Sequence, residues 1–281
     1  MTTILYGAPV VEKIFLQTKA LIEKNHIQWY LAIFMIWDNH PGKVYVKKKK
    51  EYAEKLWLTV RVFSDFTMID KDITTCNNDI ACLWIIIQLP LPDNIADRKQ
   101  ELLDAISPSK DADCLWSTLL SQVAIHWWQM NIAPATPSAV MHLLDYYQFL
   151  LSLEWNTIAV LWQSDLIGKP LADILERYWT RVFRFDEYSD QDHMRKICKE
   201  SDMIISATGK LHLVDETFVK DDQTQIIIDV WRWMLHGKPA GDVNTARLIG
   251  KVGAITPVPG GIWPITVASL FWNLVKLYSS K

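Results

Sequence analysis

The sequence predicts an α/β protein of two domains, the second a Rossmann-like dinucleotide-binding domain. Three observations support this. Apolar runs of strand length alternate with segments of helical periodicity along the chain, which is typical of parallel sheets covered by helices. The chain has 281 residues, half of them hydrophobic, which is enough for one large or two medium cores. The alternation also restarts after the proline-containing segment Pro134–Pro137.

In the first half, short apolar runs predict the strands and apolar residues at helical spacing predict the helices. The polar, proline- or glycine-containing segments between them are predicted turns and loops. In chain order, these elements are a helix over Val10–Glu23, a strand over Tyr30–Ile36, a turn at Asn39–Gly42, a helix over Val44–Leu56, strands over Leu58–Phe63 and Leu83–Ile87, a helix over Ile95–Ile106 and a polar loop over Ser107–Asp113.

The second half opens with a predicted N-cap, Thr136, followed by Pro137 in the first helical position. This helix runs to about Tyr147 and is predicted to connect the two domains. The elements after it are strands over Thr157–Leu161, Arg181–Phe185, Met203–Ala207 and Gln225–Val230, a loop over Trp162–Pro170 that enters a helix, a stiff loop over Thr256–Pro264, and a helix over Thr266–Leu277. The stiff loop is either a rigid connector or a wall of a ligand pocket.

Composition excludes several classes of function. The net charge of −3 gives no basic surface for nucleic acid. No apolar run reaches the roughly 18 residues that would suggest a membrane span, and the charged N-terminal segment is unlike a signal peptide. The four cysteines contain no CxxC pair, so we expect free thiols in a reducing compartment, the cytoplasm, and no metal site.

The strand predicted at Leu83–Ile87 ends in a polar amide, Gln88. Pro90 and Pro92 follow and turn the chain away from the sheet. Ligands of open α/β sheets bind outside the carboxyl ends of the strands, so Gln88 is a candidate binding residue. A polar residue that closes a strand has the same pattern, and the residues alone favour that simpler interpretation.

Eight short motifs, each common by itself, follow one another along nearly the whole chain. They are Tyr45-Val46-x-x-Lys49, Gln88-Leu89-Pro90-Leu91-Pro92, Lys110-Asp111-Ala112-Asp113, Pro134-x-Thr136-Pro137, Ser164-x-x-x-Gly168-Lys169-Pro170, Ile228-Asp229-Val230, Gly241-Asp242-Val243 and Thr256-Pro257-Val258-Pro259-Gly260-Gly261. Together and in this order, they resemble the bifunctional methylenetetrahydrofolate dehydrogenase/methenyltetrahydrofolate cyclohydrolase family.

The resemblance implies two α/β domains with the folate-binding, active-site cleft between them. It also implies a homodimer that oxidises 5,10-methylenetetrahydrofolate with NADP or NAD and hydrolyses the methenyl product to 10-formyltetrahydrofolate. The implied domains are residues 1–136, completed by the C-terminal helix 261–281, for folate and catalysis, and residues 137–260 for the cofactor. Two alternatives are a catalytically impaired homologue that serves as a folate-binding or dimerisation protein, and an enzyme with cyclohydrolase activity only.

The resemblance assigns three catalytic residues. Lys49 would move protons in the hydrolytic step, which requires a lowered pKa from burial and from the neighbouring lysines 47, 48 and 50. Gln88 would hold the amine, and Asp113 would bind the amino-pyrimidine edge of the pterin. Without the resemblance, the lysine run is typical of a solvated helix face and Asp113 of a loop cap. The implied substrate-binding residues are Tyr45, which would stack on the folate ring, Leu89, Pro259, Gly260, Gly261 and Pro264.

The implied cofactor-binding residues lie at the ends of strands in the second half. They are Trp162, Gln163, Ser164, Gly168, Asp186, Glu187, Thr208 and Arg232. Gln163 stands where many NADP-dependent members of the family have arginine. Asp186 and Glu187 follow the second strand, where an acid accepts a hydrogen bond from a ribose 2′-OH and repels a 2′-phosphate. We therefore hypothesise that NAD is used at least as well as NADP; the alternative is that both acids are solvated strand-end residues.

The chain has 14 tryptophans and only 10 glycines. Eight tryptophans fall where the family typically has glycine: Trp37, Trp57, Trp84, Trp155, Trp162, Trp179, Trp231 and Trp263. An indole at position 162 should block dinucleotide binding, because backbone must approach phosphate there. The chain is then a degenerate pseudoenzyme, a protein repacked around indoles, or the product of a gene that reads UGA as glycine but was translated with tryptophan. Replacement by a single residue type favours the third explanation.

Overall fold

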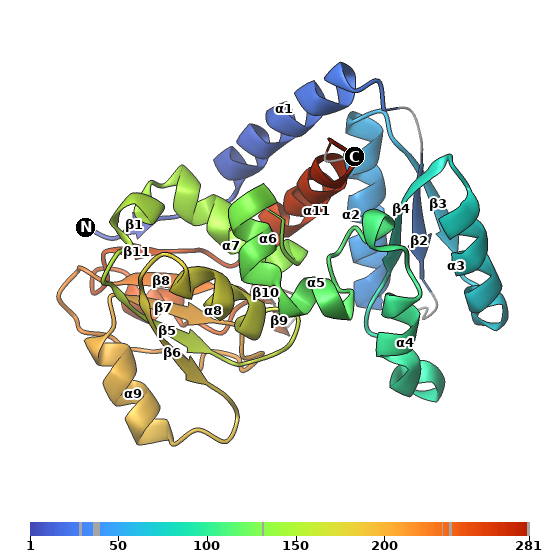
Figure 1. Cartoon of the computed structure of the whole chain (residues 1–281). Coiled ribbons are helices and arrows are strands. Elements are labelled where there is room, and N and C mark those ends of the chain that lie inside the picture. Colours follow the sequence, from blue (N-terminus) through green and yellow to red (C-terminus); the bar gives the residue numbers. More distant parts are fainter. Residues whose placement is uncertain (28–29, 36–39, 131, 232, 236–237, 280–281) are drawn as a thin grey trace. The chain divides into compact units, whose positions relative to one another are not determined.

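The structure is a computed structural model and describes residues 1–281 except 28–29, 36–39, 131, 232, 236–237 and 280–281. The chain divides into two compact units, residues 1–13 with 136–269 and residues 14–135 with 270–281. Helices α1 (Ala8–Lys24) and α11 (Ile262–Ser279) contribute residues to both units (Figure 1). Within these described ranges, none of the helices has the length and apolar character needed to cross a membrane.

The first unit contains a six-stranded sheet in the order β1-β11-β8-β7-β5-β6, with every neighbouring pair parallel. Its strands are β1 (Thr3–Ile4), β5 (Thr157–Leu161), β6 (Arg181–Phe185), β7 (Met203–Ser206), β8 (Ile226–Asp229) and β11 (Ala254–Ile255). The other elements are α7 (Ala135–Tyr146), η4 (Phe149–Ser152), α8 (Gly168–Glu176), α9 (Gln191–Glu200), α10 (Thr245–Leu248) and the antiparallel pair β9 (Trp233–Leu235) and β10 (Lys238–Ala240).

The sequence predicted four strands of this sheet well: β5, β7 and β8, which are mostly apolar, and the edge strand β6, which contains two arginines. The predictions for β5 and β6 are confirmed over their whole lengths, and those for β7 and β8 to within one residue at each end. β7 is buried at all four residues, as expected of a strand covered on both faces. Helix α9 was not predicted. It begins at an N-cap, Asp190, whose side chain accepts a hydrogen bond from the backbone N–H of His193 at 2.7 Å.

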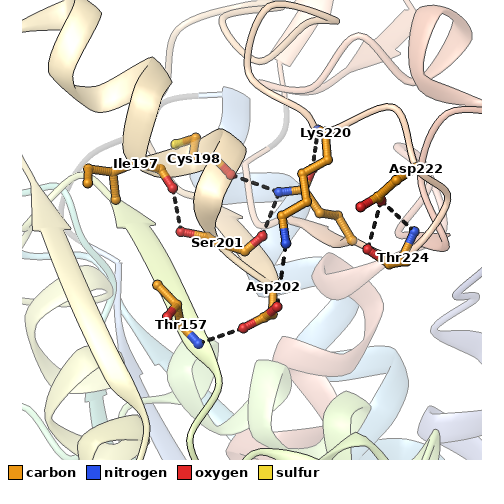
Figure 2. Close-up of polar contacts among 9 residues, drawn as sticks. Thr157, Ile197, Cys198, Ser201, Asp202, Lys220, Asp222 and Thr224 are labelled. Atoms are coloured by element: carbon orange, nitrogen blue, oxygen red, sulfur yellow. Dashed lines mark hydrogen bonds and ion pairs between the residues drawn. The ribbon is translucent and has the colours of Figure 1, made fainter.

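The amino ends of β5, β7 and β8 are closed by a polar network (Figure 2). Asp202 accepts hydrogen bonds from the Thr157 backbone N–H at 2.8 Å and from Lys220 Nζ at 3.5 Å. Buried Gln225 donates to the backbone carbonyls of Cys198 and Ser201, both at 2.7 Å. The polar groups at this amino edge are therefore hydrogen-bonded within the protein. Ligands of such sheets bind at the opposite edge, at the carboxyl ends of the strands.

The second unit contains a three-stranded parallel sheet in the order β3-β2-β4. Its strands are β2 (Tyr30–Phe34), β3 (Thr59–Phe63) and β4 (Cys82–Ile87), and β4 is buried throughout. The helical elements are α2 (His40–Lys55), η1 (Phe66–Met68), α3 (Ile69–Asn78), η2 (Asp93–Arg98), α4 (Lys99–Asp104), η3 (Pro108–Lys110), α5 (Ser117–Ser121) and α6 (Val123–Met130). The prediction of a two-part α/β fold with parallel sheets is therefore confirmed.

Three predicted boundaries are wrong in the same way, because proline and glycine were taken to exclude helix. α2 already begins at His40, so the predicted turn at 39–42 is helical over its described part. Gly168 begins α8, and Ile262 begins α11, ahead of the predicted start at Thr266. The first turn of a helix needs no intrahelical partner for its N–H groups, so proline is tolerated there.

Three other predictions need correction. α7 begins at Ala135, so Thr136 lies inside the helix and is not its N-cap. The helix predicted over residues 95–106 is divided into η2 and α4. The loop predicted as polar over residues 107–113 contains η3, and its Asp111 and Ala112 are buried.

Candidate active site

Lys49 lies on the buried face of α2 and is 7% exposed, which is unusual for a lysine. The helix places it there because Val46, Ala53 and Leu56, at helical spacing from Lys49, are all buried. The Nζ atom of Lys49 donates a hydrogen bond to Oε1 of Gln88 at 3.1 Å. The structure thus brings together two residues that are 39 positions apart in the sequence.

Gln88 is held firmly at the carboxyl end of β4. Its backbone N–H donates to the carbonyl of Phe34 at 2.9 Å, which extends the pairing of β4 with β2 by one residue. Its side-chain Nε2 donates to the carbonyl of Leu89 at 3.0 Å. This second bond orients the amide so that its oxygen faces Lys49.

Burial lowers the pKa of Lys49, because removal from water disfavours the charged ammonium. The carboxylate of Asp113 acts in the opposite direction and raises this pKa. The expectation that burial shifts Lys49 is confirmed. The expectation that Lys47, Lys48 and Lys50 contribute is wrong: all three are exposed, and water screens their charges.

The motif Lys110–Asp113 combines two structural residues with one half-buried acid. Lys110 Nζ donates to three backbone carbonyls at the end of α3, at 2.8–2.9 Å. Asp111 accepts from the backbone N–H of Trp116 at 2.8 Å, and burial raises its pKa to about 7. Asp113 is half-buried and close enough to Lys49 to influence its pKa. Asp113 is therefore the acid of the motif that remains available to a ligand.

Tyr45 and Leu89 flank the Lys49–Gln88 pair in the sequence. Tyr45 precedes Lys49 by four residues on α2, so the two side chains lie on neighbouring positions of one helix face. Both Tyr45 and Leu89 are half-buried, which leaves part of each side chain accessible. The Leu89–Pro90 peptide bond is cis.

The proline- and glycine-rich loop forms a pocket of about 290 Å³ in the first unit. The pocket is lined by Asp229–Trp231 and Pro257–Pro264, so all four substrate-binding candidates of this loop contribute to it. Gly260 has φ of +106°, a conformation that favours glycine. Of the two interpretations of the loop, the wall of a pocket is the one that the structure shows.

The loop between β5 and α8 carries four of the cofactor candidates. Trp162 follows β5 with φ of +84°, and its backbone N–H donates to the carbonyl of Phe185 at 2.6 Å. Gly168 begins α8, and a Cβ atom there would lie 1.8 Å from the carbonyl oxygen of Trp162. Gln163 and Ser164 lie between them, and each has a buried side-chain oxygen without a hydrogen-bond partner among the described residues.

The remaining cofactor candidates follow the neighbouring strands. Asp186 and Glu187 are exposed just after β6, and Asp186 Oδ1 accepts from the backbone N–H of Tyr188 at 3.0 Å and from Ser189 Oγ at 2.9 Å. Thr208 follows β7, and its backbone N–H and Oγ1 both donate to Asp242, at 2.6 and 2.9 Å. Candidate Arg232 lies outside the described residues.

Comparison with known proteins gives two matches that together cover most of the chain. Residues 134–281 match the family described as tetrahydrofolate dehydrogenase/cyclohydrolase, NAD(P)-binding domain, and residues 5–113 match its catalytic domain. The bifunctional protein FolD of Lactobacillus acidophilus is 33% identical over 95% of this chain and 92% of its own length. The chain belongs to the tetrahydrofolate dehydrogenase/cyclohydrolase family.

Solved structures of the tetrahydrofolate dehydrogenase/cyclohydrolase family have the same fold. The bifunctional FolD enzyme of Campylobacter jejuni superposes with a TM-score of 0.91 at 29% identity, over 100% of this chain and 99% of that one. The Trypanosoma brucei enzyme, solved with NADP and an inhibitor, has a TM-score of 0.88 at 27% identity, over 99% and 98% of the two chains. The sequence-based assignment of the family and fold is confirmed.

An NAD(P) cofactor of this family fits the β5–α8 loop in all respects but one. The N-terminus of α8 would hold the pyrophosphate, and Gly168 lets the Trp162 backbone pack against the start of α8. The unpartnered oxygens of Gln163 and Ser164 supply polar groups beside it. The exception is Trp162, whose indole is a large side chain at the position where the backbone should approach the phosphate.

Asp242, part of the motif Gly241-Asp242-Val243, shapes the carboxyl edge of the six-stranded sheet, a role that the sequence did not predict. Asp242 is fully buried, and its Oδ2 accepts hydrogen bonds from Ser206, Thr208 and Gly209 at 2.6–3.2 Å. It therefore holds the loop after β7 in shape, and Thr208 is oriented by Asp242. A buried aspartate 34 residues from its partner leaves no local signal in the sequence.

Proposed function

We propose that this chain is a bifunctional one-carbon folate enzyme. It oxidises 5,10-methylenetetrahydrofolate to 5,10-methenyltetrahydrofolate with NAD(P)⁺, and it hydrolyses the methenyl compound to 10-formyltetrahydrofolate. The single observation that supports this best is the buried Lys49 amine, hydrogen-bonded at 3.1 Å to Gln88 and lowered in pKa by burial, in a chain that matches both domains of the family.

For the hydrolytic step, Lys49 moves the protons. Water adds to the methenyl carbon, the bond from that carbon to N5 breaks, and N5 receives one proton of the water; the other is released to solvent as the added oxygen becomes the formyl carbonyl. A lysine in its neutral form takes the proton from water and, as the ammonium, returns it to the leaving nitrogen. Gln88 positions the amine without adding charge. Asp113 anchors the amino-pyrimidine edge of the pterin, Tyr45 stacks on its ring, and the other substrate-binding candidates complete the contacts.

For the oxidation, the residues of this chain position the reactants. NAD(P)⁺ supplies the hydride acceptor when bound. Ser164, Gly168 and the N-terminus of α8 would hold the pyrophosphate, and positioning of the two reactants would supply most of the rate. No side chain has to transfer a proton in this step.

The choice of cofactor depends on the acids after β6. Asp186 uses Oδ1 in a local turn, which leaves Oδ2 to accept a hydrogen bond from a ribose 2′-OH. We propose that NAD is used at least as well as NADP. Initial rates of oxidation with the two cofactors at equal concentrations test this, and a strong preference for NADP contradicts it.

We propose that residues 1–136 with 261–281 serve folate and residues 137–260 the cofactor; residues 1–13 and 261–269 of the proposed folate part belong to the compact unit that contains the cofactor candidates. The chain acts as a cytoplasmic homodimer, an assignment that rests on the family resemblance and, for the compartment, on its four free thiols. Size-exclusion chromatography with light scattering tests the dimer, and a monomer at micromolar concentration contradicts it.

One observation favours a second candidate, an enzyme with cyclohydrolase activity alone. If the protein carries Trp162, the cofactor loop is obstructed while Lys49 and Gln88 are unaffected. Following methenyltetrahydrofolate by absorbance separates the candidates. Its formation from the methylene compound with NAD(P)⁺ and its disappearance by hydrolysis support the bifunctional enzyme; hydrolysis alone supports the second candidate; neither supports the catalytically impaired folate-binding homologue.

A further inference from the structure

Four tryptophans have a left-handed backbone. Ten described residues other than glycine have positive φ, and four of these ten are tryptophan: Trp57 (+58°), Trp155 (+68°), Trp162 (+84°) and Trp179 (+59°). Tryptophan makes up 14 of the 281 residues, so chance alone would give fewer than one. A bulky residue rarely adopts this conformation, because its Cβ approaches a backbone carbonyl, whereas glycine adopts it freely.

Trp57 occupies the position that ends a helix with glycine. Its backbone N–H donates to the carbonyl of Glu54 at 3.0 Å, and the N–H of Leu58 donates to the carbonyl of Ala53 at 2.9 Å. These two bonds define a Schellman motif that terminates α2, and the left-handed residue of that motif is most often glycine. The Trp57 side chain is 67% exposed, so burial of the indole does not explain its presence.

Trp155 and Trp179 lie in the turns that precede β5 and β6. The N–H of Trp155 donates to the carbonyl of Trp179 at 3.0 Å, which joins the two left-handed turns. Their side chains are 77% and 72% exposed. By contrast, Trp127 has an ordinary helical backbone in α6 and is 4% exposed, as expected of the largest apolar side chain.

Trp162 is fixed on both sides of its backbone. Its N–H donates to the carbonyl of Phe185 at the end of β6, and its carbonyl oxygen lies 1.8 Å from where a Cβ at position 168 would be. In the turn between β5 and α8, these contacts are made with Trp162 in the left-handed conformation. Glycine is the residue that meets this requirement and also lets backbone approach a phosphate.

We infer that positions 57, 155, 162 and 179 are glycine in the protein that its own cell makes, because the gene encodes glycine with UGA there and the written sequence renders UGA as tryptophan. A degenerating chain would replace left-handed glycines with many residue types, and a repacked one would bury its indoles. Trp84, Trp231 and Trp263 have φ outside this region and add nothing to the inference, and Trp37 lies outside the described residues.

The gene tests the inference directly. UGA is expected at codons 57, 155, 162 and 179, and UGG is expected at the internal controls Trp127 and Trp128, whose backbone is helical. UGG at the four positions overturns the inference. UGA at the controls as well overturns it too, since UGA would then encode tryptophan throughout the gene.

Protein stability gives a second test that is independent of activity. The chain with Trp57→Gly, Trp155→Gly, Trp162→Gly and Trp179→Gly together should melt at a higher temperature than the chain as written, by about 2 °C or more per substitution. The matched control is Trp128→Gly, which removes an indole that is 63% exposed but sits in helix α6, and which should lower the melting temperature. A fourfold variant that melts lower than the parent overturns the inference.

The consequence for the cofactor rests on the proposed dehydrogenase function. Titration with NAD⁺ and NADP⁺ should show binding at least tenfold tighter to the fourfold variant than to the chain as written. A variant that melts higher but binds neither nucleotide leaves the glycine assignment standing and removes the proposed oxidation. The melting and binding readouts thus separate failure of the inference from failure of the function.

Discussion

Replacing Gln88 with glutamate tests whether Lys49 is the group that moves protons. The substitution places a carboxylate where an amide oxygen now accepts a hydrogen bond from Lys49 at 3.1 Å. At that separation and an effective dielectric constant of about 20, a unit charge stabilises the ammonium by about 5 kcal/mol, which corresponds to about four pKa units. Since the new carboxylate is itself half-buried and loses solvation, this figure is an upper limit for the rise in the pKa of Lys49.

The assay is the pH dependence of methenyltetrahydrofolate hydrolysis, measured by absorbance and corrected for the uncatalysed reaction. A raised pKa of Lys49 moves the pH limb of the rate to higher pH, whether the group acts as base or acid. Gln17→Glu is the control, because Gln17 is exposed on α1 and its charge should leave the profile unchanged. If the pH–rate profile of Gln88→Glu is the same as that of the parent, and the variant has the parent's melting temperature, then ionisation of Lys49 does not control the rate.

Three further predictions follow from individual residues. Lys49→Met should slow hydrolysis by about 100-fold or more, while Lys48→Met, at an exposed position, should keep it, as measured by the same absorbance assay. Gly168→Ala should weaken nucleotide binding and lower stability by at least about 1–3 kcal/mol, because its Cβ would lie 1.8 Å from the Trp162 carbonyl; nucleotide titration and urea unfolding measure this. Burial raises the pKa of Asp229 to about 8, so the folded chain keeps a proton that the unfolded chain loses near pH 4. Stability from this group is therefore full below about pH 4 and lost as pH rises to about 8, and urea unfolding of Asp229→Asn should show a flatter pH dependence.

The sequence predicted elements whose pattern is local. β5 is an apolar run with clear ends. The lysine run by itself favoured a solvated helix face, and the burial of Lys49 became an expectation only through the family resemblance. Gln88 could be placed at a strand tip because two prolines follow it. That the two side chains meet at 3.1 Å could not be read from any local pattern, and it became an expectation only through the family resemblance.

The residues that escaped prediction act over long separations in the chain. Lys110 looks like an ordinary loop lysine, yet its ammonium is held by carbonyls that lie 31–34 residues earlier, at the end of α3. Asp242 shapes a loop 33–36 residues away. Helix α3 was missed because its apolar positions are few, Ile69, Ile73 and Cys76 being its buried residues. Such contacts depend on how strands are ordered in the sheet, which composition and periodicity do not specify.

The surroundings of Lys49 show why a neutral partner matters at this position. A carboxylate in direct contact would hold the lysine as ammonium, and the residue could not take a proton from water near neutral pH. Complete burial without any partner would instead keep the amine neutral, so that it could not accept a proton from water and form the ammonium that protonates N5. Gln88 supplies a hydrogen bond without charge, and Asp113 opposes the effect of burial through its field. Burial and Asp113 thus shift the pKa of Lys49 in opposite directions, and a residue that acts as base and then as acid needs a pKa that neither influence drives to an extreme.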